Sequence, residues 1–589
     1  AFISSKNKQY PSKQFESAFN LLSHRGPDFS KVIYGKKNNF SYQLGHHRLS
    51  IRDISDNANQ PFFSECENYI LLFNGEIYNV DKLKNLIKRK FFKTTSDTEI
   101  LLYFLIENRK NFELINGIYS FIFIDLKLEK AIISRDPLGV KPIYYAKANG
   151  GVIFSSEPKS IVQLDDNFKK ISNESVVNLI NYGYVGYQNS FFKDIKSISP
   201  GSTFEFFNND LKIINKIDLN FQNNELDQKQ KFTQDYLEEE IEKTIKSQTV
   251  SDVPVCIWQS GGIDSSIINF TLKEQKIKNF ILKFYGKNFD ESSQAKLISN
   301  SLRREFNEIE WPNSETIEKN FEKMVWHVDG EIADSSAMAA LILSEKTSHF
   351  SKVVLSGDGG DEIFGGYPTY NATLFANYLK FLPKNICQII SKISAKLQQH
   401  EARYTVFELM NRFFSYSHLG VNAHSQWRRY SNIDLSKKLF VNECLDINKE
   451  EIMFNEVKKY YQNLDNLNSI KSKSQAIDLK FYLPSDMLIR LDRMTMAHGV
   501  EARVPLLDFD LLKKLFALGR DNYNSNLFET KPLLRKMAKN LGVHPKIYKK
   551  RKTGFNINVD YCVDQLRNHQ KKIFNNLEVF EGIFDLDIV

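Results

Sequence analysis

Short runs of hydrophobic residues, separated by turn-forming residues, dominate the chain from its start to about residue 200. The runs that show this most clearly are Tyr69–Phe73, Ser120–Leu126 and Lys130–Ser134. Turn formers such as Asn74-Gly75 and Asp136-Pro137 are predicted to close them. Helical patterns are fewer and lie around Phe15–Leu22 and Asp97–Glu107. This mixture predicts layered α and β structure with a sheet core.

From about residue 231 the pattern changes to short strand, glycine-containing loop and helix. Val253–Gln259 is typical of a buried strand, and Ile263–Gln275 can form the helix that follows it. Further strands are predicted at Asn279–Phe284 and Lys352–Leu355, and most of 370–589 is predicted to be helical. Alternating strands and helices imply a parallel sheet with crossover connections and, here, a helical extension.

The polar segment 208–230 separates the two patterns and has little regular hydrophobic spacing. We therefore predict an N-terminal domain at 1–207, a linker at 208–230 and a C-terminal domain at 231–589. A chain of 589 residues is too long for one core, which agrees with this division.

Composition narrows the class of protein without giving its chemistry. Hydrophobic residues are 42% and charged residues 25% of the chain, as in ordinary soluble proteins, and the net charge of +8 does not single out nucleic acid. The five cysteines include no CxxC pair, which favours reduced thiols over a metal site. No apolar run reaches the ~18 residues that span a bilayer, and the start AFISSKNKQY is too polar for a signal peptide. We expect a cytoplasmic protein with neither a membrane nor a nucleic-acid partner.

The segment SGGIDSS at 260–266 directly follows a predicted buried strand and enters a predicted helix. Glycines allow close backbone approach, free N–H groups point outward, and the helix dipole favours an anion. Ser260, Gly261, Gly262, Asp264 and Ser265 are thus candidate phosphate-binding residues. The GxxxxGK[ST] pattern is absent, and SGGxDS instead resembles the pyrophosphate loop of enzymes that split ATP between the α and β phosphates.

A carboxylate within a phosphate loop requires a bridging cation, so Asp264 predicts Mg²⁺. A second acidic group is expected, and the segment SGDGGDE at 356–362, again after a strand, supplies it. Asp361 is the candidate second metal ligand, Ser356 and Gly357 are candidate phosphate contacts, and Asp358 is a candidate for orienting or deprotonating an amine nucleophile.

Motifs along nearly the whole chain resemble those of the glutamine-hydrolysing asparagine synthetases. In the C-terminal half they are VSDVPVCIWQSGGIDSS (250–266), VVLSGDGGDEIFGGY (353–367) and LDRMTMAHGVEARVPLLD (491–508). In the N-terminal half they are SHRGPD (23–28), LGHHRLSI (44–51), NGEIYN (74–79), SDTEILL (96–102), RDPLGVKPIYY (135–145) and FSSEPKSI (154–161).

The resemblance implies an N-terminal-nucleophile glutaminase with antiparallel sheets between helices, joined to an ATP-pyrophosphatase domain. It implies glutamine, aspartate and ATP as substrates, Mg²⁺, a β-aspartyl-AMP intermediate, ammonia passing between the sites, and a homodimer. By motif position, Arg48 would hold the glutamine carboxylate, Asn74 and Gly75 would form the oxyanion hole, and Glu76 and Asp97 would bind the glutamine amino group.

The resemblance also assigns Lys531, in TKPLLRK, to the charge that develops on the phosphates. Arg503 in EARVPLLD is interpreted as structural, because the helix before it is rich in residues of buried type.

Two departures from the family pattern affect what is expected. The family's nucleophile is an N-terminal cysteine in a Cys-Gly-Ile start, whereas this chain begins Ala1-Phe2-Ile3, about four or five residues short of that position. We therefore expect the chain as written to use ammonium salts and not glutamine. The second departure is Ala339-Ala340, where relatives commonly have Pro-Thr near the acceptor.

Two alternatives to asparagine formation remain open. The same adenylation chemistry could act on another carboxylate, such as a sugar acid of a surface polysaccharide or the substrate of a β-lactam-type ring closure. A chain that binds nucleotide as a scaffold, without turnover, is the alternative outside enzymology. The intact SGGIDSS and DGGDE segments and Lys531 oppose the second alternative.

Overall fold

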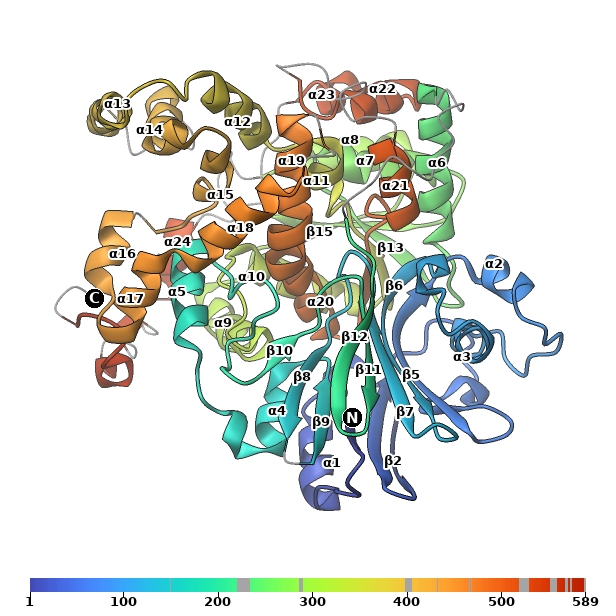
Figure 1. Cartoon of the computed structure of the whole chain (residues 1–589). Coiled ribbons are helices and arrows are strands. Elements are labelled where there is room, and N and C mark those ends of the chain that lie inside the picture. The colour runs from blue at the N-terminus through green and yellow to red at the C-terminus, as the bar shows by residue number, and fades with distance from the viewer. Residues whose placement is uncertain are drawn as a thin grey trace.

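The computed structural model of the chain describes residues 1–148, 150–219, 233–284, 290–397, 405–431, 433–464, 467, 469–517, 529–550, 559–566, 570–571 and 575–586. Its N-terminal half contains two antiparallel sheets and its C-terminal half a parallel sheet surrounded by helices (Figure 1). This arrangement confirms the predicted fold class.

The first antiparallel sheet has the strand order β10-β8-β9-β1-β3-β2. In chain order its strands are β1 (Phe2–Ser4), β2 (Phe29–Lys37), β3 (Phe40–Arg48), β8 (Tyr144–Ala148), β9 (Gly151–Ser155) and β10 (Lys196–Ser197). Helices α1 (Ser12–Asn20) and α4 (Pro158–Leu164) pack on its outer face, where Phe15 and Ile161 share a cluster with Phe2 and Ile153.

The second antiparallel sheet has the order β12-β11-β7-β6-β5-β4. Its strands are β4 (Phe62–Phe63), β5 (Tyr69–Ile77), β6 (Gly117–Asp125), β7 (Lys130–Arg135), β11 (Ser202–Phe207) and β12 (Asp210–Lys216), with helices α2 (Val80–Asn85) and α3 (Asp97–Glu107) outside.

Both faces of the central strands are buried, which explains their unbroken hydrophobic runs. In β5, Leu71 and Phe73 pack toward α3, whereas Ile70 and Leu72 pack between the two sheets. Side chains alternate across a strand, so one run of residues contributes to two separate cores. The resulting order of layers is helix, sheet, sheet, helix.

Two sequence expectations about this half are wrong. The pair Asn74-Gly75 does not close a strand, because β5 continues to Ile77 and pairs Asn74 with Ser120 and Gly75 with Tyr119. Gly75 has φ +141°, and a Cβ there would lie 1.9 Å from the Ile118 carbonyl oxygen, so the glycine is needed for the close strand contact.

The other error concerns the expected linker at 208–230. Its first part is β12, which forms a hairpin with β11 and extends the second sheet to Lys216. The alternating pattern there is weak because β12 lies at the sheet edge with Ile213 and Ile214 exposed. Residues 220–232 lie outside the described part of the chain.

The parallel sheet has the order β15-β14-β13-β16-β17, and every pairing within it is parallel. Its strands are β13 (Val255–Trp258), β14 (Lys278–Lys283), β15 (Phe306–Glu310), β16 (Val353–Leu355) and β17 (Glu501–Arg503). The helices nearest to it in sequence are α6 (Gln234–Ser247), α7 (Ile263–Thr271), α8 (Ser292–Ser301), α9 (Ser314–Val328), α10 (Ser336–Ser348) and α11 (Gly360–Phe364).

Helices make up most of the described chain after residue 360, as predicted. They include α12 (Pro368–Tyr378), α13 (Lys384–Lys396), α14 (Val406–Tyr416), α15 (Ala423–Gln426), α16 (Ile433–Leu439), α17 (Asn442–Glu450), α18 (Ile452–Gln462), α19 (Ile470–Ile477), α20 (Leu488–Met496), α21 (Phe509–Ala517), α22 (Pro532–Asn540), α23 (Pro545–Tyr548) and α24 (Val559–Gln565). A π-helical segment, Asp478–Met487, joins α19 to α20 and contains Pro484, which cannot donate a helical hydrogen bond. Among the residues described, no helix combines the length and the hydrophobicity needed to cross a membrane.

Candidate active sites

The loops with the phosphate-binding and acidic motifs leave neighbouring strands at the same edge of the parallel sheet. Strand β13 pairs with β14 on one side and β16 on the other, so the strand order reverses at β13. Ligands of open α/β sheets bind where such a reversal occurs, outside the carboxyl ends of the strands. Ser260 follows β13 and Ser356 follows β16, so the fold brings both motifs to this position.

The glycine loop is held by side-chain acceptors. The N–H of Gly262 donates to Ser260 Oγ at 3.1 Å, and the N–H of Gly261 donates to Glu291 Oε2 at 3.1 Å. The expectation that these N–H groups are free is therefore wrong for both glycines. Because the Gly261 N–H already donates to a carboxylate oxygen of Glu291, the loop can bind anionic oxygens. The start of α7 has no side-chain cap.

Lys531 lies between the two carboxylates that the sequence assigned to metal. Its Nζ is 2.5 Å from Asp264 Oδ2 and 2.6 Å from Asp361 Oδ1, and its side chain is 3% exposed. The backbone of Lys531 has φ 54°, a left-handed conformation that is uncommon for a residue with a side chain. The lysine is therefore held in an unfavourable backbone conformation at the point where the two loops meet.

Glycines allow these loops to come so close together. A Cβ at Gly366 would lie 1.8 Å from Asp361 Oδ1 and 2.3 Å from Lys531 Cε, and a Cβ at Gly357 would lie 2.9 Å from Asp264 Cβ. These approaches are shorter than any ordinary packing contact, so both positions require glycine.

The donor set around Lys531 fits Mg²⁺. Magnesium prefers carboxylate and phosphate oxygens, and Asp264 and Asp361 provide two carboxylates near the glycine loop. The second oxygen of Asp264, Oδ1, is buried and has no hydrogen-bond partner, which leaves a ligand atom available for a cation.

Asp358 belongs to a network of ion pairs separate from the one around Lys531. Its Oδ1 is 2.7 Å from Arg490 Nη2, and its Oδ2 accepts a hydrogen bond from the Ser356 hydroxyl. Arg490 also contacts Asp334 Oδ2 at 3.2 Å and donates a hydrogen bond to Ser336 Oγ at 2.5 Å, which orients its guanidinium. Sequence analysis did not identify Arg490 or Asp334 as site residues.

Asp486, in the π-helical segment, is the most unusual acidic residue near this network. It is 1% exposed, and neither of its carboxylate oxygens has a hydrogen-bond partner of ordinary geometry. Burial and the negative charge of Asp334 raise its pKa well above the ordinary range. Buried carboxylates without partners are rare in proteins and point to a function.

One cavity of about 250 Å³ joins these groups. Its phosphate end is lined by Ser260, Asp264, Gly357 and Asp361, and its other end by polar and aromatic residues that include Asp334, Tyr430, Tyr482 and Arg490. The apolar part of the wall is formed by Phe280 to Leu282 on β14 and by Ala340 and Leu343 on α10, so it includes Ala340 of the departure noted in the sequence.

A second cavity, of about 150 Å³, contains all the predicted glutamine-site residues: Arg48, Asn74, Gly75, Glu76 and Asp97. Asn74 Nδ2 is buried and has no hydrogen-bond partner, so a donor remains available at the position predicted for the oxyanion hole. His46, which was not predicted, lines the same cavity, and burial lowers its pKa to about 4.

The charged residues of this cavity already have partners. Arg48 donates to Ser55 O and Asn59 Oδ1, both at 2.8 Å, so its guanidinium is directed into its own loop. Burial, with the charge of Asp97, raises the pKa of Glu76 to about 8 although Arg503 and Arg52 contact it. An ammonium group between Glu76 and Asp97 would relieve that repulsion.

Helix α20 connects the two cavities. Arg490 and Leu491 line the larger cavity, and Met496, at the other end of the helix, lines the smaller one. Next to it Arg503, fully buried, contacts Glu76 of the N-terminal half at 2.9 Å and Glu501 at 2.9 Å. The interpretation of Arg503 as structural agrees with these contacts, which join the two halves.

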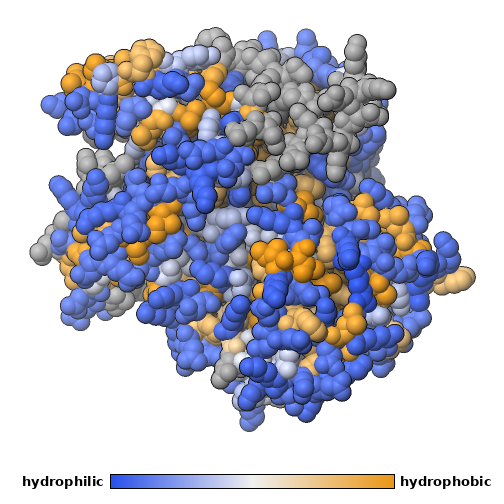
Figure 2. All heavy atoms as spheres, viewed as in Figure 1, coloured by the Kyte–Doolittle hydropathy of each residue, from blue (hydrophilic) through white to orange (hydrophobic). Residues whose placement is uncertain are grey.

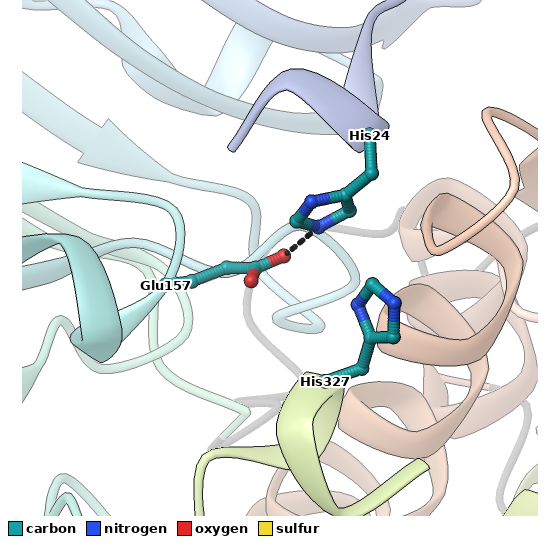
Figure 3. Close-up of side chains that lie close together, drawn as sticks. All are labelled: His24, Glu157 and His327. Carbon is teal, nitrogen blue, oxygen red and sulfur yellow. Dashed lines mark hydrogen bonds and ion pairs between the residues drawn. The ribbon is translucent and has the colours of Figure 1, made fainter. Parts of the chain in front are cut away.

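Within the part of the chain that the structure describes, His24, Glu157 and His327 form a further cluster of possible metal ligands, at the contact between the halves (Figure 3). His24 Nε2 lies 3.1 Å from Glu157 Oε1. The same carboxylate is 2.9 Å from Arg25 and 3.1 Å from Arg493. A divalent cation would therefore be surrounded by permanent positive charge, and we interpret the cluster as an ion network between the halves.

Comparisons with known proteins agree with this geometry. Residues 236–589, more than half of the chain, match the family described as asparagine synthase, and residues 1–216 match a glutamine amidotransferase domain. The chain is 28% identical to glutamine-hydrolysing asparagine synthetase 1 of Bacillus subtilis, over 95% of this chain and 85% of that protein. It is 31% identical to a putative glutamine-hydrolysing asparagine synthetase of Methanocaldococcus jannaschii, over 64% of this chain and 76% of that one. An amidase, chyE, of Penicillium rubens is 26% identical over 85% and 77% of the two chains. With its C-terminal half matching throughout and an amidotransferase domain before it, the chain belongs to the asparagine synthase family.

Proposed function

We propose that the chain makes asparagine from aspartate, ATP and a nitrogen donor, either glutamine or ammonia, with release of AMP and pyrophosphate. The observation that carries the proposal is the meeting of Asp264, Asp361 and Lys531 beside the glycine loop, at one end of the cavity that residues of both motifs line. The names of the relatives in Bacillus subtilis and Methanocaldococcus jannaschii support aspartate as the acceptor.

In the adenylation step, an oxygen of the acceptor carboxylate attacks the α-phosphorus of ATP, and the bond to the bridging oxygen breaks as pyrophosphate leaves. Ser260, Ser265 and the uncapped start of α7 bind the leaving pyrophosphate. Lys531 balances the negative charge that grows on it. Asp264 and Asp361 would hold Mg²⁺, which would supply charge stabilisation for the phosphates.

The acceptor lies at the polar and aromatic end of the cavity. Its α-carboxylate faces the guanidinium of Arg490, and its α-ammonium faces Asp334 and the buried Asp486 behind it. An incoming ammonium would place a positive charge near the buried Asp486 carboxyl, in addition to the charges of Arg490 and Arg428. Asp358, oriented by Arg490 and Ser356, faces the nitrogen nucleophile as it attacks the acyl carbon and AMP leaves.

Water is unfavourable for both reactive species, because an acyl-adenylate hydrolyses and free ammonia is mostly protonated at neutral pH. Helix α20, whose residues line both cavities, places the two sites within one protein interior. We propose that nitrogen from the amidotransferase half reaches the acyl-adenylate along this helix.

Pyrophosphate release with ammonium chloride as nitrogen donor tests the synthetase half. The panel contains aspartate, glutamate and a uronic acid, with Asp264→Asn as the inactive control and mass spectrometry to identify the product. We expect release with aspartate and formation of asparagine. A preference for the sugar acid would favour the alternative acceptor, and no release with any acid would favour a scaffold.

The register of β1 suggests a test of the amidotransferase half. Phe2 pairs with Gln43 and Ile3 with Tyr42, so each residue added before Ala1 advances one position along β3, and the fourth comes opposite Arg48. A chain extended by Met-Cys-Gly-Ile and one linking residue places its cysteine at that position once the methionine is removed. We expect this chain to release glutamate from glutamine and a serine version not to do so.

A further inference from the structure

The helical hairpin α13–α14 presents hydrophobic residues to solvent and packs polar residues inside. Ile386, Ile389, Ile393 and Leu397, spaced along one face of α13, are 45%, 57%, 55% and 51% exposed. Helix α14 has no buried residue at all, and its Leu409 is 53% exposed. Figure 2 shows hydrophobic residues gathered at the upper left, over α12, α13 and α14. In the hydrophobic pattern of a water-soluble helix, these residues should face the core.

The contact between the two helices includes small and polar side chains. Cys387 and Ser394 are the buried residues of α13. Ser391 Oγ donates to Asn411 Oδ1 of α14 at 2.7 Å and lies 3.0 Å from Ser415 Oγ. Small residues and hydrogen-bonded serine and asparagine between helices are the packing found where the surroundings are lipid.

The charge along the α13 side of the hairpin selects one partner, while α14 carries one acidic and one basic residue, Glu408 and Arg412. Residues 379–396 include four lysines, Lys380, Lys384, Lys392 and Lys396, and no acidic residue. By helical spacing Lys392 and Lys396 lie beside the isoleucine face, where long lysine side chains can reach lipid head groups. Two copies of the chain joined by this surface would bring these like charges together, whereas a membrane with anionic lipids would neutralise them.

We propose that α13 and α14 bind the surface of membranes that contain anionic phospholipids, with the isoleucine face of α13 in the boundary between head groups and acyl chains. A helix of thirteen residues is about 20 Å long and too short for the ~30 Å hydrocarbon core, so the hairpin lies in the interface and does not span it. The proposal is independent of which acceptor the enzyme uses.

Flotation of the full chain with vesicles tests this surface. We expect the protein to bind vesicles of phosphatidylcholine with about one third phosphatidylglycerol, to bind pure phosphatidylcholine weakly, and to be released as salt rises. The variant Ile389→Glu/Ile393→Glu should lose binding at least about tenfold, because two exposed side chains that enter the interface are replaced by charges. The matched control makes the same change at Ile213 and Ile214, which are equally exposed on β12.

Melting temperature and ammonium-dependent pyrophosphate release show that both variants are folded, because all four side chains point to solvent in the parent. Absence of binding to anionic vesicles would overturn the proposal, as would equal loss in the β12 control. Light scattering after size-exclusion chromatography tests whether a second copy of the chain covers the hairpin instead. A dimer of the parent chain that Ile389→Glu/Ile393→Glu converts to a monomer would assign the hairpin to a second copy and refute membrane binding.

Discussion

Replacement of Lys531 by methionine isolates the charge at the centre of the synthetase site. Methionine keeps the length of the aliphatic chain and removes the ammonium that contacts Asp264 at 2.5 Å and Asp361 at 2.6 Å. Glycine would be a poorer choice, because it would also relieve the left-handed backbone of Lys531 and so change two properties at once. Methionine, in contrast, removes the buried ammonium and keeps a side chain on the left-handed backbone of residue 531.

The magnitude follows from what the ammonium does at each stage. Two charge-assisted hydrogen bonds of about 1.5–3 kcal/mol each hold Lys531 in the resting protein, and Mg²⁺ between the same carboxylates can replace much of that interaction. Nothing replaces Lys531 against the charge on leaving pyrophosphate, for which loss of one donor costs about 2.7–4 kcal/mol. We expect kcat to fall about 10²- to 10³-fold, with KM for ATP nearly unchanged at saturating Mg²⁺.

Initial rates of pyrophosphate release, with ammonium as the nitrogen donor, measure both constants without the amidotransferase site. Lys536→Met is the matched control, because Lys536 lies exposed on the same helix, α22. Calorimetric titration of ATP onto each protein separates binding from turnover. If Lys531→Met raises KM for ATP strongly and leaves kcat within tenfold, the lysine serves to bind the ground state and the reasoning here is wrong.

Other predictions concern binding and stability. Asp486→Asn should raise KM for aspartate at least about tenfold and leave KM for ATP unchanged, because the α-ammonium loses its buried anion; equal effects on both would contradict this. Arg503→Met should destabilise the protein by about 3 kcal/mol in urea unfolding, because it removes the buried cation shared by Glu76 and Glu501 and leaves them only Arg52 and Lys141; a loss below about 1 kcal/mol would count against the linking role. Gly75→Ala should abolish glutamine binding, measured by titration, and spare ammonium-dependent synthesis, since its Cβ would strike the next strand. Glu331 tests how stability depends on pH. Burial raises the pKa of its carboxyl from 4.5 to about 7, so its favourable contribution to the free energy of unfolding is complete below pH 4.5 and is lost as pH rises through 7. Between pH 4.5 and 8 the free energy of unfolding of the parent should fall by about 3 kcal/mol relative to that of Glu331→Gln. A difference between the two proteins that stays constant with pH would exclude this titration.

Local patterns were sufficient for β13, β14 and β16 and for the loops that follow β13 and β16, whereas β15 and β17 were not predicted. The run Val253–Gln259 and the glycines after it predicted both β13 and the start of α7, because strand burial and glycine conformation are local properties. Most residues that the motifs single out line one of the two cavities, and their roles stay predictions. Asn74-Gly75 was misread as a turn, because a glycine required by a neighbouring strand has the same local signal as a glycine required by a turn.

The remaining site residues depend on contacts that no local pattern contains. Glu291 reaches Gly261 from a segment thirty positions away, and Arg490 joins Asp334 and Asp358 across the cavity. Asp486 sits in a π-helical segment around Pro484, and an irregular helix shifts which residues share a face. The expectation of no membrane partner rested on hydrophobic length and stays a prediction; length does not test a short hairpin whose hydrophobic residues face outward.

Helix α20 also joins the walls of the two cavities at a fixed spacing. Leu491 and Met496 belong to different cavities and are five residues apart, about 7.5 Å along the helix axis. Inserting or deleting one residue between them would rotate one end by about 100° relative to the other and turn one of these side chains away from its cavity. Substitutions within one cavity can therefore change what that cavity binds, whereas the length of α20 is shared by both cavities and cannot change for one of them alone.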